Sequence, residues 1–297
     1  MNNKKLFLPK VSLIVVTYNN QETIEENIRS LLNQNYPIKL LEIIYIDSST
    51  DKTTSILRKY DREICYYYQP RKGIPAARNL GIKKATGKVI AFTDADCFPK
   101  RDWLIKLVGY FTLSHSTVAV GGKLPNNKPA NVLEKYIANI TSNHQSHLSD
   151  HLPYLLTANV AFLRKIFDEV GFFDENLVSG EDADICWRIR KAGYELKYAS
   201  EAEVYFKNRD TIKGLITQSF RDGRGWHMLD IKYGLSNRQL ISTISGNAKK
   251  FLMPRNNILN KKNRYQISFL LRLIYYFCYQ IPYFIGLLWP IPRGVKK

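Results

Sequence analysis

The stretch VSLIVVTYNN, residues 11–20, gives a strong indication of the fold. Its first seven residues form an apolar run rich in β-branched side chains, which is typical of a strand buried in a parallel sheet. The polar residues Tyr18, Asn19 and Asn20 follow at once. Ligands of open α/β sheets bind beyond the carboxyl ends of the strands, so we expect these polar residues to face a binding site.

Strands and helices alternate along the first hundred residues. Helical spacing follows at residues 23–32, 53–60 and 75–85, and strands are expected at 41–46, 64–68 and 89–93. This β-α-β pattern predicts an α/β protein with a doubly wound sheet. Further on, we expect helices at 103–110 and 182–192, and strands at 118–121, 155–163, 195–198 and 203–206.

Length and composition set the domain organisation. The chain has 297 residues and four cysteines without CxxC spacing, which indicates neither a zinc site nor a disulfide framework and favours a reducing compartment. The apolar run at 11–16 is too short for the core of a signal peptide. We expect a basic tail at 1–10, a globular domain at 11–228 and a basic, apolar region at 229–297.

The C-terminal region carries charge of one sign. The formal net charge is +18, and the sequence after Asp230 contains no Asp or Glu, whereas Lys and Arg recur up to Lys297. Such a region implies an anionic partner, which would be a membrane surface, a lipid phosphate or a nucleic acid. Residues 273–292 lack charge and are rich in Tyr. Proline and glycine within them argue against a simple membrane-spanning helix and favour a segment in the membrane interface, with a core helix pair as the alternative.

Two carboxylates, Asp94 and Asp96, follow the strand expected at 89–93. A hard cation such as Mg²⁺ or Mn²⁺ takes oxygen ligands and shares its shell with substrate phosphates. The pair therefore predicts a cation site that grips a diphosphate. A solvated turn or a helix cap is the structural alternative.

Other polar groups lie at the ends of neighbouring elements. Asp47 follows the second strand and would accept hydrogen bonds from a base or ribose, or would cap the next helix. The cations Arg71, Lys72 and Arg78 flank Gly73 and would meet phosphate, or would simply begin a surface helix.

Two further stretches admit a catalytic and a structural interpretation. Glu181 and Asp182 head a helix, where a carboxylate would take the proton of an acceptor hydroxyl or would only cap the helix. The glycine-containing stretch 220–227 would form a lid over the diphosphate, or a turn between helices.

Taken together, these motifs resemble family 2 glycosyltransferases with the GT-A fold over residues 11–225. The resemblance is carried by stretches whose order and spacing match: VSLIVVTYNN (11–20), DSSTDKT (47–53), GIPAARNLG (73–81), ATG (85–87), FTDADCFP (92–99), TANVAFLR (157–164), VGFFD (170–174) and GEDADICWRIRKAG (180–193).

The resemblance implies roles for several residues. The nucleotide-sugar would be bound by Thr17, Tyr18, Asn19, Asp47, Gly73, Arg78 and Asp94. Asp96, with Asp94, would hold Mn²⁺ or Mg²⁺, and Asp182 beside Glu181 would be the base of an inverting transfer. The chain departs from the family by a shorter motif at Asp47 and by Phe206 where many members have histidine, so that water or His227 would complete the metal shell.

We therefore expect a metal-dependent inverting glycosyltransferase with a doubly wound mixed sheet and a basic, helical, membrane-associating C-terminal appendage. It would move sugar from a UDP-, GDP- or dTDP-linked donor to a lipid-linked glycan acceptor in polysaccharide or glycoprotein glycan assembly. It would act at the cytoplasmic face of the membrane as a peripheral or monotopic protein. The alternatives are a polyprenyl-phosphate sugar synthase and a non-catalytic basic membrane scaffold. Acidic clusters at the strand ends oppose nucleic-acid binding. A nucleotidyltransferase is disfavoured because no glycine-rich basic loop follows the first strand.

Overall fold

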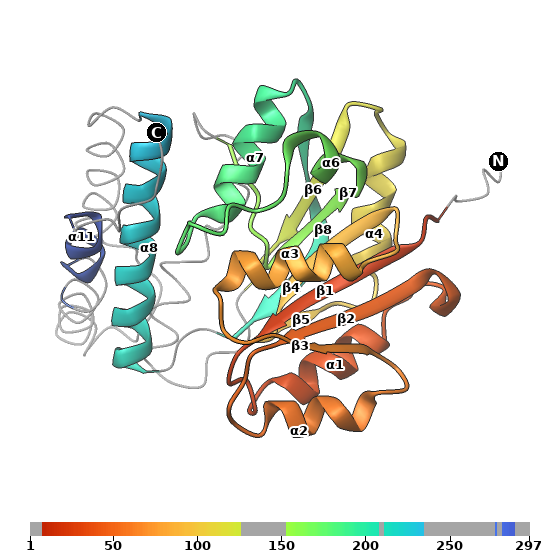
Figure 1. Cartoon of the computed structure of the whole chain (residues 1–297). Helices are drawn as coiled ribbons and strands as arrows, with labels where there is room; N and C mark the ends of the chain where they lie inside the picture. Colours follow the sequence, from red (N-terminus) through yellow and green to blue (C-terminus); the bar gives the residue numbers. More distant parts are fainter. Residues whose placement is uncertain (1–7, 126–152, 208–210, 235–276, 278–280, 289–297) are drawn as a thin grey trace, which may run out of the picture. The chain divides into compact units, whose positions relative to one another are not determined.

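The computed structural model describes residues 8–125, 153–207, 211–234, 277 and 281–288 (Figure 1). These residues fall into two compact units, and each is described separately. The first contains the sheet and its covering helices. The second contains residues 176–180 and the C-terminal helices. The first unit ends at Lys207, and helix α8 (Ile212–Tyr233) runs without a break through the boundary expected at residue 228.

The first unit is built on one mixed sheet, with strand order β3-β2-β1-β4-β7-β6-β8-β5. β1 is parallel to β2 and β4, and β2 is parallel to β3. Antiparallel pairing begins between β4 and β7. This arrangement confirms the expected α/β class and the doubly wound mixed sheet. The strands are β1 (Val11–Thr17), β2 (Leu41–Asp47), β3 (Cys65–Tyr68), β4 (Val89–Asp94), β5 (Cys97–Pro99), β6 (Thr117–Lys123), β7 (Asn159–Leu163) and β8 (Glu195–Phe206).

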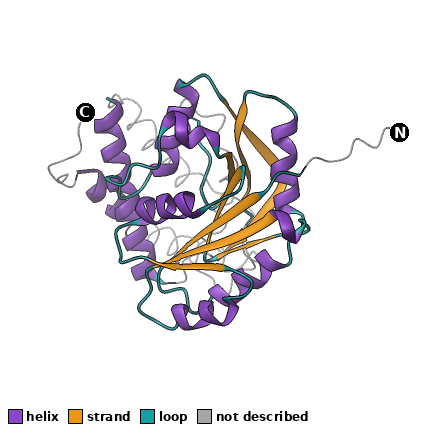
Figure 2. Ribbon diagram, turned by 45° about the vertical axis from the view of Figure 1, so that its right-hand side comes forward, coloured by secondary structure: helices purple, strands orange, loops and turns teal. Residues whose placement is uncertain are grey.

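Helices cover both faces of the sheet (Figure 2). On one face the core includes Val11, Leu13 and Val15 of β1 with α1 (Ile24–Leu32), α2 (Thr53–Leu57) and α4 (Trp103–Gly109). On the other face Ile14 packs in the cluster of α3 (Ile74–Lys84), α6 (Lys165–Val170) and α7 (Glu181–Lys191). Alternate residues of β1 thus enter two cores, which explains why most of the run is apolar.

Two glycines of the predicted motifs are required by close backbone approach or by backbone conformation. A Cβ at Gly87 would lie 2.5 Å from the backbone nitrogen of Ser12. Gly73 has φ +103 and precedes α3, a conformation that a side chain would strain. Each glycine therefore has a structural reason to be where it is.

The second unit corrects one expectation. Residues 220–227 lie inside helix α8, so they form neither a lid loop nor a turn. Their glycines serve packing, because a Cβ at Gly223 would lie 2.0 Å from the carbonyl oxygen of Tyr283 in α11 (Ile281–Leu288). α11 is part of the segment expected at the membrane interface, and it exposes Ile285 and Leu288. Among the described residues, no helix combines the length and apolar character needed to cross a bilayer.

Candidate active site

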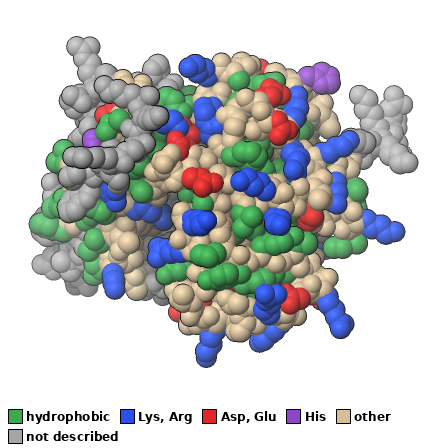
Figure 3. All heavy atoms as spheres, viewed as in Figure 1, with side chains coloured by type: hydrophobic (Ala, Val, Ile, Leu, Met, Phe, Trp, Pro, Cys, Tyr) green, Lys and Arg blue, Asp and Glu red, His purple; other side chains and the backbone are tan. Residues whose placement is uncertain are grey.

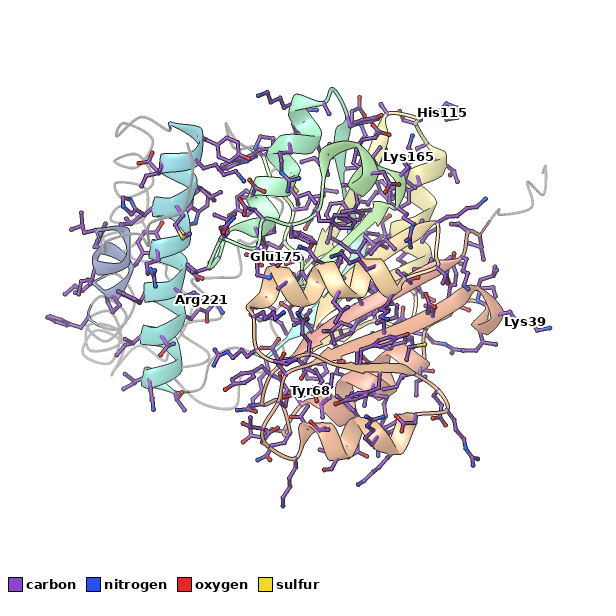
Figure 4. All side chains as sticks on the ribbon, in the orientation of Figure 1. Lys39, Tyr68, His115, Lys165, Glu175 and Arg221 are labelled. Carbon is purple, nitrogen blue, oxygen red and sulfur yellow. The ribbon has the colours of Figure 1, made fainter. Side chains whose placement is uncertain are left out.

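The carboxyl ends of three neighbouring strands bring the predicted polar residues to one edge of the sheet. In the strand register, Thr17 of β1 lies opposite Asp47 of β2, and the preceding Val16 lies opposite Asp94 of β4. Tyr68 ends β3 at the same edge, where Figure 4 labels it. The expectation that strand ends would gather the polar clusters is confirmed.

The turn from Asp94 to Cys97, which we call the cation turn, joins β4 to β5 and presents oxygen ligands. Ligand atoms of Asp94, Asp96 and Cys97 all lie within 4.8 Å of one another, a spacing that suits one metal ion. Burial raises the pKa of the Cys97 thiol well above its usual value, so the thiol stays protonated and is a poor partner for a hard cation. The two carboxylates are therefore the donors that fit Mg²⁺ or Mn²⁺.

Phe206 ends β8 directly opposite Cys97 of β5, so it lies next to the cation turn and supplies no ligand. His227 belongs to α8 in the other unit. His144, His147 and His151, whose helical spacing in the sequence would also permit a metal site, lie outside the described residues. The residue after Phe206, Lys207, donates its backbone N–H to the carbonyl oxygen of Asp96 at 3.0 Å.

Arg78 joins the cation turn to the acidic pair at the start of α7. The Arg78 side chain is only 5% exposed; its Nη2 lies 3.3 Å from Asp94 Oδ1, and its Nη1 forms a close ion pair with Glu181 Oε1. Burial alone lowers the pKa of Arg78, but the nearby carboxylates of Glu181, Asp94 and Asp182 outweigh it and raise the pKa. The two acidic motifs, far apart in the sequence, are therefore held together by one buried guanidinium.

Asp182, the predicted base, has a carboxyl group poised near neutrality. Burial, and then the charge of Glu181, raise its pKa to about 7, although Arg78 acts in the opposite direction. One of its oxygens accepts the N–H of Ala183 at 2.9 Å. A general base works best when its pKa lies close to the working pH, so this environment suits proton abstraction.

Asp47 holds its own loop in place. The residue is fully buried; its carboxylate accepts the N–H of Ser49 at 2.9 Å and the hydroxyl groups of Thr54 and Tyr66 at 2.6 and 3.1 Å. It does not cap α2, whose N-cap is Lys52. Its observed bonds shape the loop after β2, and a contact with a nucleotide stays a prediction.

The loop after β1 presents an exposed aromatic ring at this edge. Thr17 is buried and donates to Asn20 Oδ1 at 3.0 Å. Tyr18 is 40% exposed, and the guanidinium of Arg71 lies 4.1 Å from its ring centroid. Asn19 has φ +55, and its backbone N–H and side-chain Oδ1 bond to the loop after β2. The ring of Tyr18 thus projects from a well-bonded loop beside a cation.

The sequence model for "Glycosyl transferase family 2" matches residues 12–171 of this chain. The chain belongs to glycosyl transferase family 2. Among curated relatives of this family 2 enzyme is the Haloferax volcanii protein "Glycosyltransferase AglE", 30% identical over 73% of each chain. "Glucosyl-dolichyl phosphate glucuronosyltransferase" of the same organism is 27% identical over 75% of this chain and 78% of its own.

Solved structures agree on the fold of this family 2 enzyme. "Mannosyltransferase PcManGT from Pyrobaculum calidifontis in complex with GDP-Man and Mn2+" matches with a TM-score of 0.66 at 20% identity, over 96% of this chain and 88% of the other. "S. aureus TarS 1-349 in complex with UDP-GlcNAc" matches with a TM-score of 0.54 at 20% identity, over 71% of this chain and 66% of the other. The predicted GT-A fold and the predicted enzyme class, glycosyltransferase, are confirmed.

The main acidic groups could be predicted from the sequence, whereas the contacts that connect them could not. The ion pair of Arg78 with Glu181 spans 103 positions, and nothing in either motif indicates it. A second missed link ties α3 to the segment before α7, where Asn79 donates to Glu175 at 2.8 Å. Figure 4 labels Glu175. Cys97 belongs to the FTDADCFP motif, but only the folded turn brings its sulfur near both carboxylates.

Proposed function

We propose that this glycosyltransferase is metal-dependent and inverting, and that it transfers sugar from a nucleotide-linked donor to a membrane-associated acceptor. One observation carries the proposal: the buried Arg78 contacts both Asp94 of the cation turn and Glu181 of the acidic pair. Asp182, the proposed base, is the next residue after Glu181. The groups needed at the leaving diphosphate and at the attacking hydroxyl are thereby held in one site.

The proposed reaction forms one bond and breaks another at the anomeric carbon. The acceptor oxygen attacks that carbon, its proton passes to the carboxylate of Asp182, and the bond to the nucleoside diphosphate breaks. A bound Mg²⁺ or Mn²⁺, held by Asp94 and Asp96, would neutralise charge on the leaving diphosphate. One displacement with a single base inverts the centre, so an α-linked donor gives a β-linked product, by the same logic as in inverting hydrolases.

Donor binding is assigned to the edge formed by the ends of β1, β2 and β4. Thr17, Tyr18, Asn19 and Asp47 would surround the base and ribose, and Gly73 would let the chain turn beside them. Support comes from the register that brings these strand ends together. The structural matches bound to GDP-Man and to UDP-GlcNAc support a nucleotide-sugar donor.

We place the acceptor at a membrane surface, on the cytoplasmic side. The support is the acid-free, basic sequence after Asp230 and the exposed apolar residues of α11. By contrast with that acid-free sequence, the described residues on the face drawn in Figure 3 carry basic and acidic side chains interspersed. The relative named for glucosyl-dolichyl phosphate supports a lipid-linked glycan as acceptor.

Replacing Asp96 by Ala is expected to lower donor turnover about a thousandfold, because the cation would lose its main ligand and the charge on the leaving group would go uncompensated. The measurement is release of UDP, GDP or dTDP from a donor panel, with and without Mn²⁺. Asp102→Ala, which removes an exposed carboxylate at the start of α4, is the control and should keep its activity. Release from no donor in the wild type, even with lipid-linked acceptors present, would refute the proposal.

The same assay separates the proposed acceptor from its enzymatic alternative. Dolichyl phosphate and a glycosylated dolichyl phosphate are supplied in parallel. Turnover with the glycosylated lipid supports glycan elongation. Turnover only with the bare lipid phosphate would make the protein a polyprenyl-phosphate sugar synthase.

Neutralising three tail cations, in Lys261→Gln, Lys262→Gln and Arg264→Gln, is expected to weaken binding to anionic vesicles about a hundredfold, since each basic group near such a surface contributes about 1 kcal/mol. Flotation of the full chain with phosphatidylserine vesicles measures the effect. The matched control carries Lys39→Gln, Lys59→Gln and Lys88→Gln, three exposed residues of the first unit. Equal losses in the two triple variants would contradict a tail-specific contact.

A further inference from the structure

A buried amide connects helix α1 to the cation turn. Asn27 is fully buried, and its Nδ2 donates to the carbonyl oxygen of Asp94 at 3.1 Å and to that of Cys97 at 2.6 Å. These two carbonyls belong to the first and last residues of the turn. One NH₂ group therefore grips both ends of the segment from which the Asp94 and Asp96 carboxylates project.

The orientation of this amide is fixed from the opposite side by Tyr45 of β2. The fully buried Tyr45 hydroxyl donates to Asn27 Oδ1 at 2.6 Å. Because the two partners in the turn are carbonyl acceptors, only the NH₂ group can face them, and the oxygen must face the tyrosine. The hydrogen bonds thus allow a single orientation.

The surroundings of Asn27 make an amide there costly unless it is satisfied. Ile24, Ile28 and Leu31 of the same helix are fully buried in the apolar core. A polar group in such a place is tolerated when its hydrogen bonds are made. The bonds of the Asn27 side chain described above go to the cation turn and to Tyr45, so the amide links these two parts of the core.

We propose that Asn27 is a positioning residue for the metal site, held in register by Tyr45. The inference rests on the proposed function of Asp94 and Asp96 as cation ligands. By clamping both ends of the turn, Asn27 fixes the spacing of the two carboxylates before the cation arrives. Groups that orient metal ligands from outside the coordination shell typically change metal affinity about 10- to 100-fold when they are removed.

The test measures binding of Mn²⁺ alone to the full chain, from the loss of the free-ion signal in electron paramagnetic resonance. Asn27→Ala is expected to weaken Mn²⁺ binding about tenfold or more. Tyr45→Phe keeps the amide and removes only its partner, so a smaller loss of roughly threefold is expected. The control is Asn79→Ala, which removes a buried amide bonded to Phe173 and Glu175 and should leave Mn²⁺ affinity unchanged.

A double-mutant cycle provides a reading that general destabilisation would not give. If Tyr45 acts through Asn27, Tyr45→Phe has no further effect on Mn²⁺ affinity once Asn27 is Ala. Unchanged affinity in both Asn27→Ala and Tyr45→Phe overturns the inference, as does an equal loss in Asn79→Ala. If Asn27→Ala does not fold, Tyr45→Phe alone decides. A wild type that does not bind Mn²⁺ overturns both this inference and the metal clause of the proposed function.

Discussion

Asp182→Asn is expected to lower kcat about 10²- to 10⁴-fold while leaving the protein more stable above neutral pH. Asparagine keeps the size of the side chain and cannot accept the acceptor's proton, so the contribution of a general base is lost. The stability gain follows from the raised pKa of Asp182, about 7 against an ordinary 3.8. The folded state binds the proton more tightly than the unfolded chain, so stability is lost as pH rises from about 4 to 7. Thermal unfolding at pH 8 should show a higher Tm than the wild type, and at pH 4 little difference.

The pH profile and a neighbouring carboxylate supply the controls. In the wild type, kcat/KM should rise with pH until Asp182 is ionised near pH 7, and this limb should vanish in the residual activity of Asp182→Asn. Asp184→Asn on the same helix removes a buried partner of Arg188, so it should lower Tm and keep kcat. A wild-type level of activity in Asp182→Asn would assign the base to another group.

Arg78→Met is expected to destabilise the protein by about 3–5 kcal/mol, because it leaves the carboxylate of Glu181 buried without this counter-charge. Both side chains of that pair are nearly inaccessible, at 5% and 8% exposure. Methionine retains most of the volume, so the loss reports charge more than packing. For a chain of this size, Tm should fall by roughly 10 °C.

A second substitution tests that explanation. Glu181→Gln removes the buried charge, so the double variant Arg78→Met with Glu181→Gln should regain part of the lost Tm. Arg188→Met serves as the comparison for Arg78→Met. It also leaves a buried carboxylate, that of Asp184, without its cation, but in a separate ion pair. If the double variant is no more stable than Arg78→Met, the ion pair is not the source of the effect.

Much of the first unit could be predicted because its strands are apolar runs punctuated by polar ends. The expected strand at 11–17 matches β1, and the helix expected at 75–85 matches α3 within one residue. Strand β5 was missed because three residues are too few to show a period. Residues 195–206 were divided into two strands, whereas β8 runs through them with a register shift in its pairing.

The stretch 220–227 shows where local signals mislead. Two glycines close together favour a turn when only the chain itself is considered. In α8, Gly223 leaves room for the backbone of Tyr283 in α11, and Gly225 leaves room for Ser179, reasons that no local pattern contains.

The site was predictable in its parts and hidden in its connections. Asp94 and Asp96 are separated by a single residue, so the sequence predicts two carboxylates close enough to hold one cation. Asn27 offered no such signal, because an amide on a helix is usually exposed to solvent. Its importance depends on two carbonyls that lie 67 and 70 positions away.

The reversal of strand direction between β4 and β7 divides the proposed chemistry between an earlier and a later part of the chain. Every residue proposed to bind the nucleotide-sugar donor or the cation lies before β5, in the part of the chain that forms the parallel strands. The proposed base lies later in the sequence, on α7. Substitutions in the later segment are therefore expected to alter the proposed acceptor step while leaving the proposed donor-binding residues intact. Their shared constraint would be the partner that Arg78 requires at position 181.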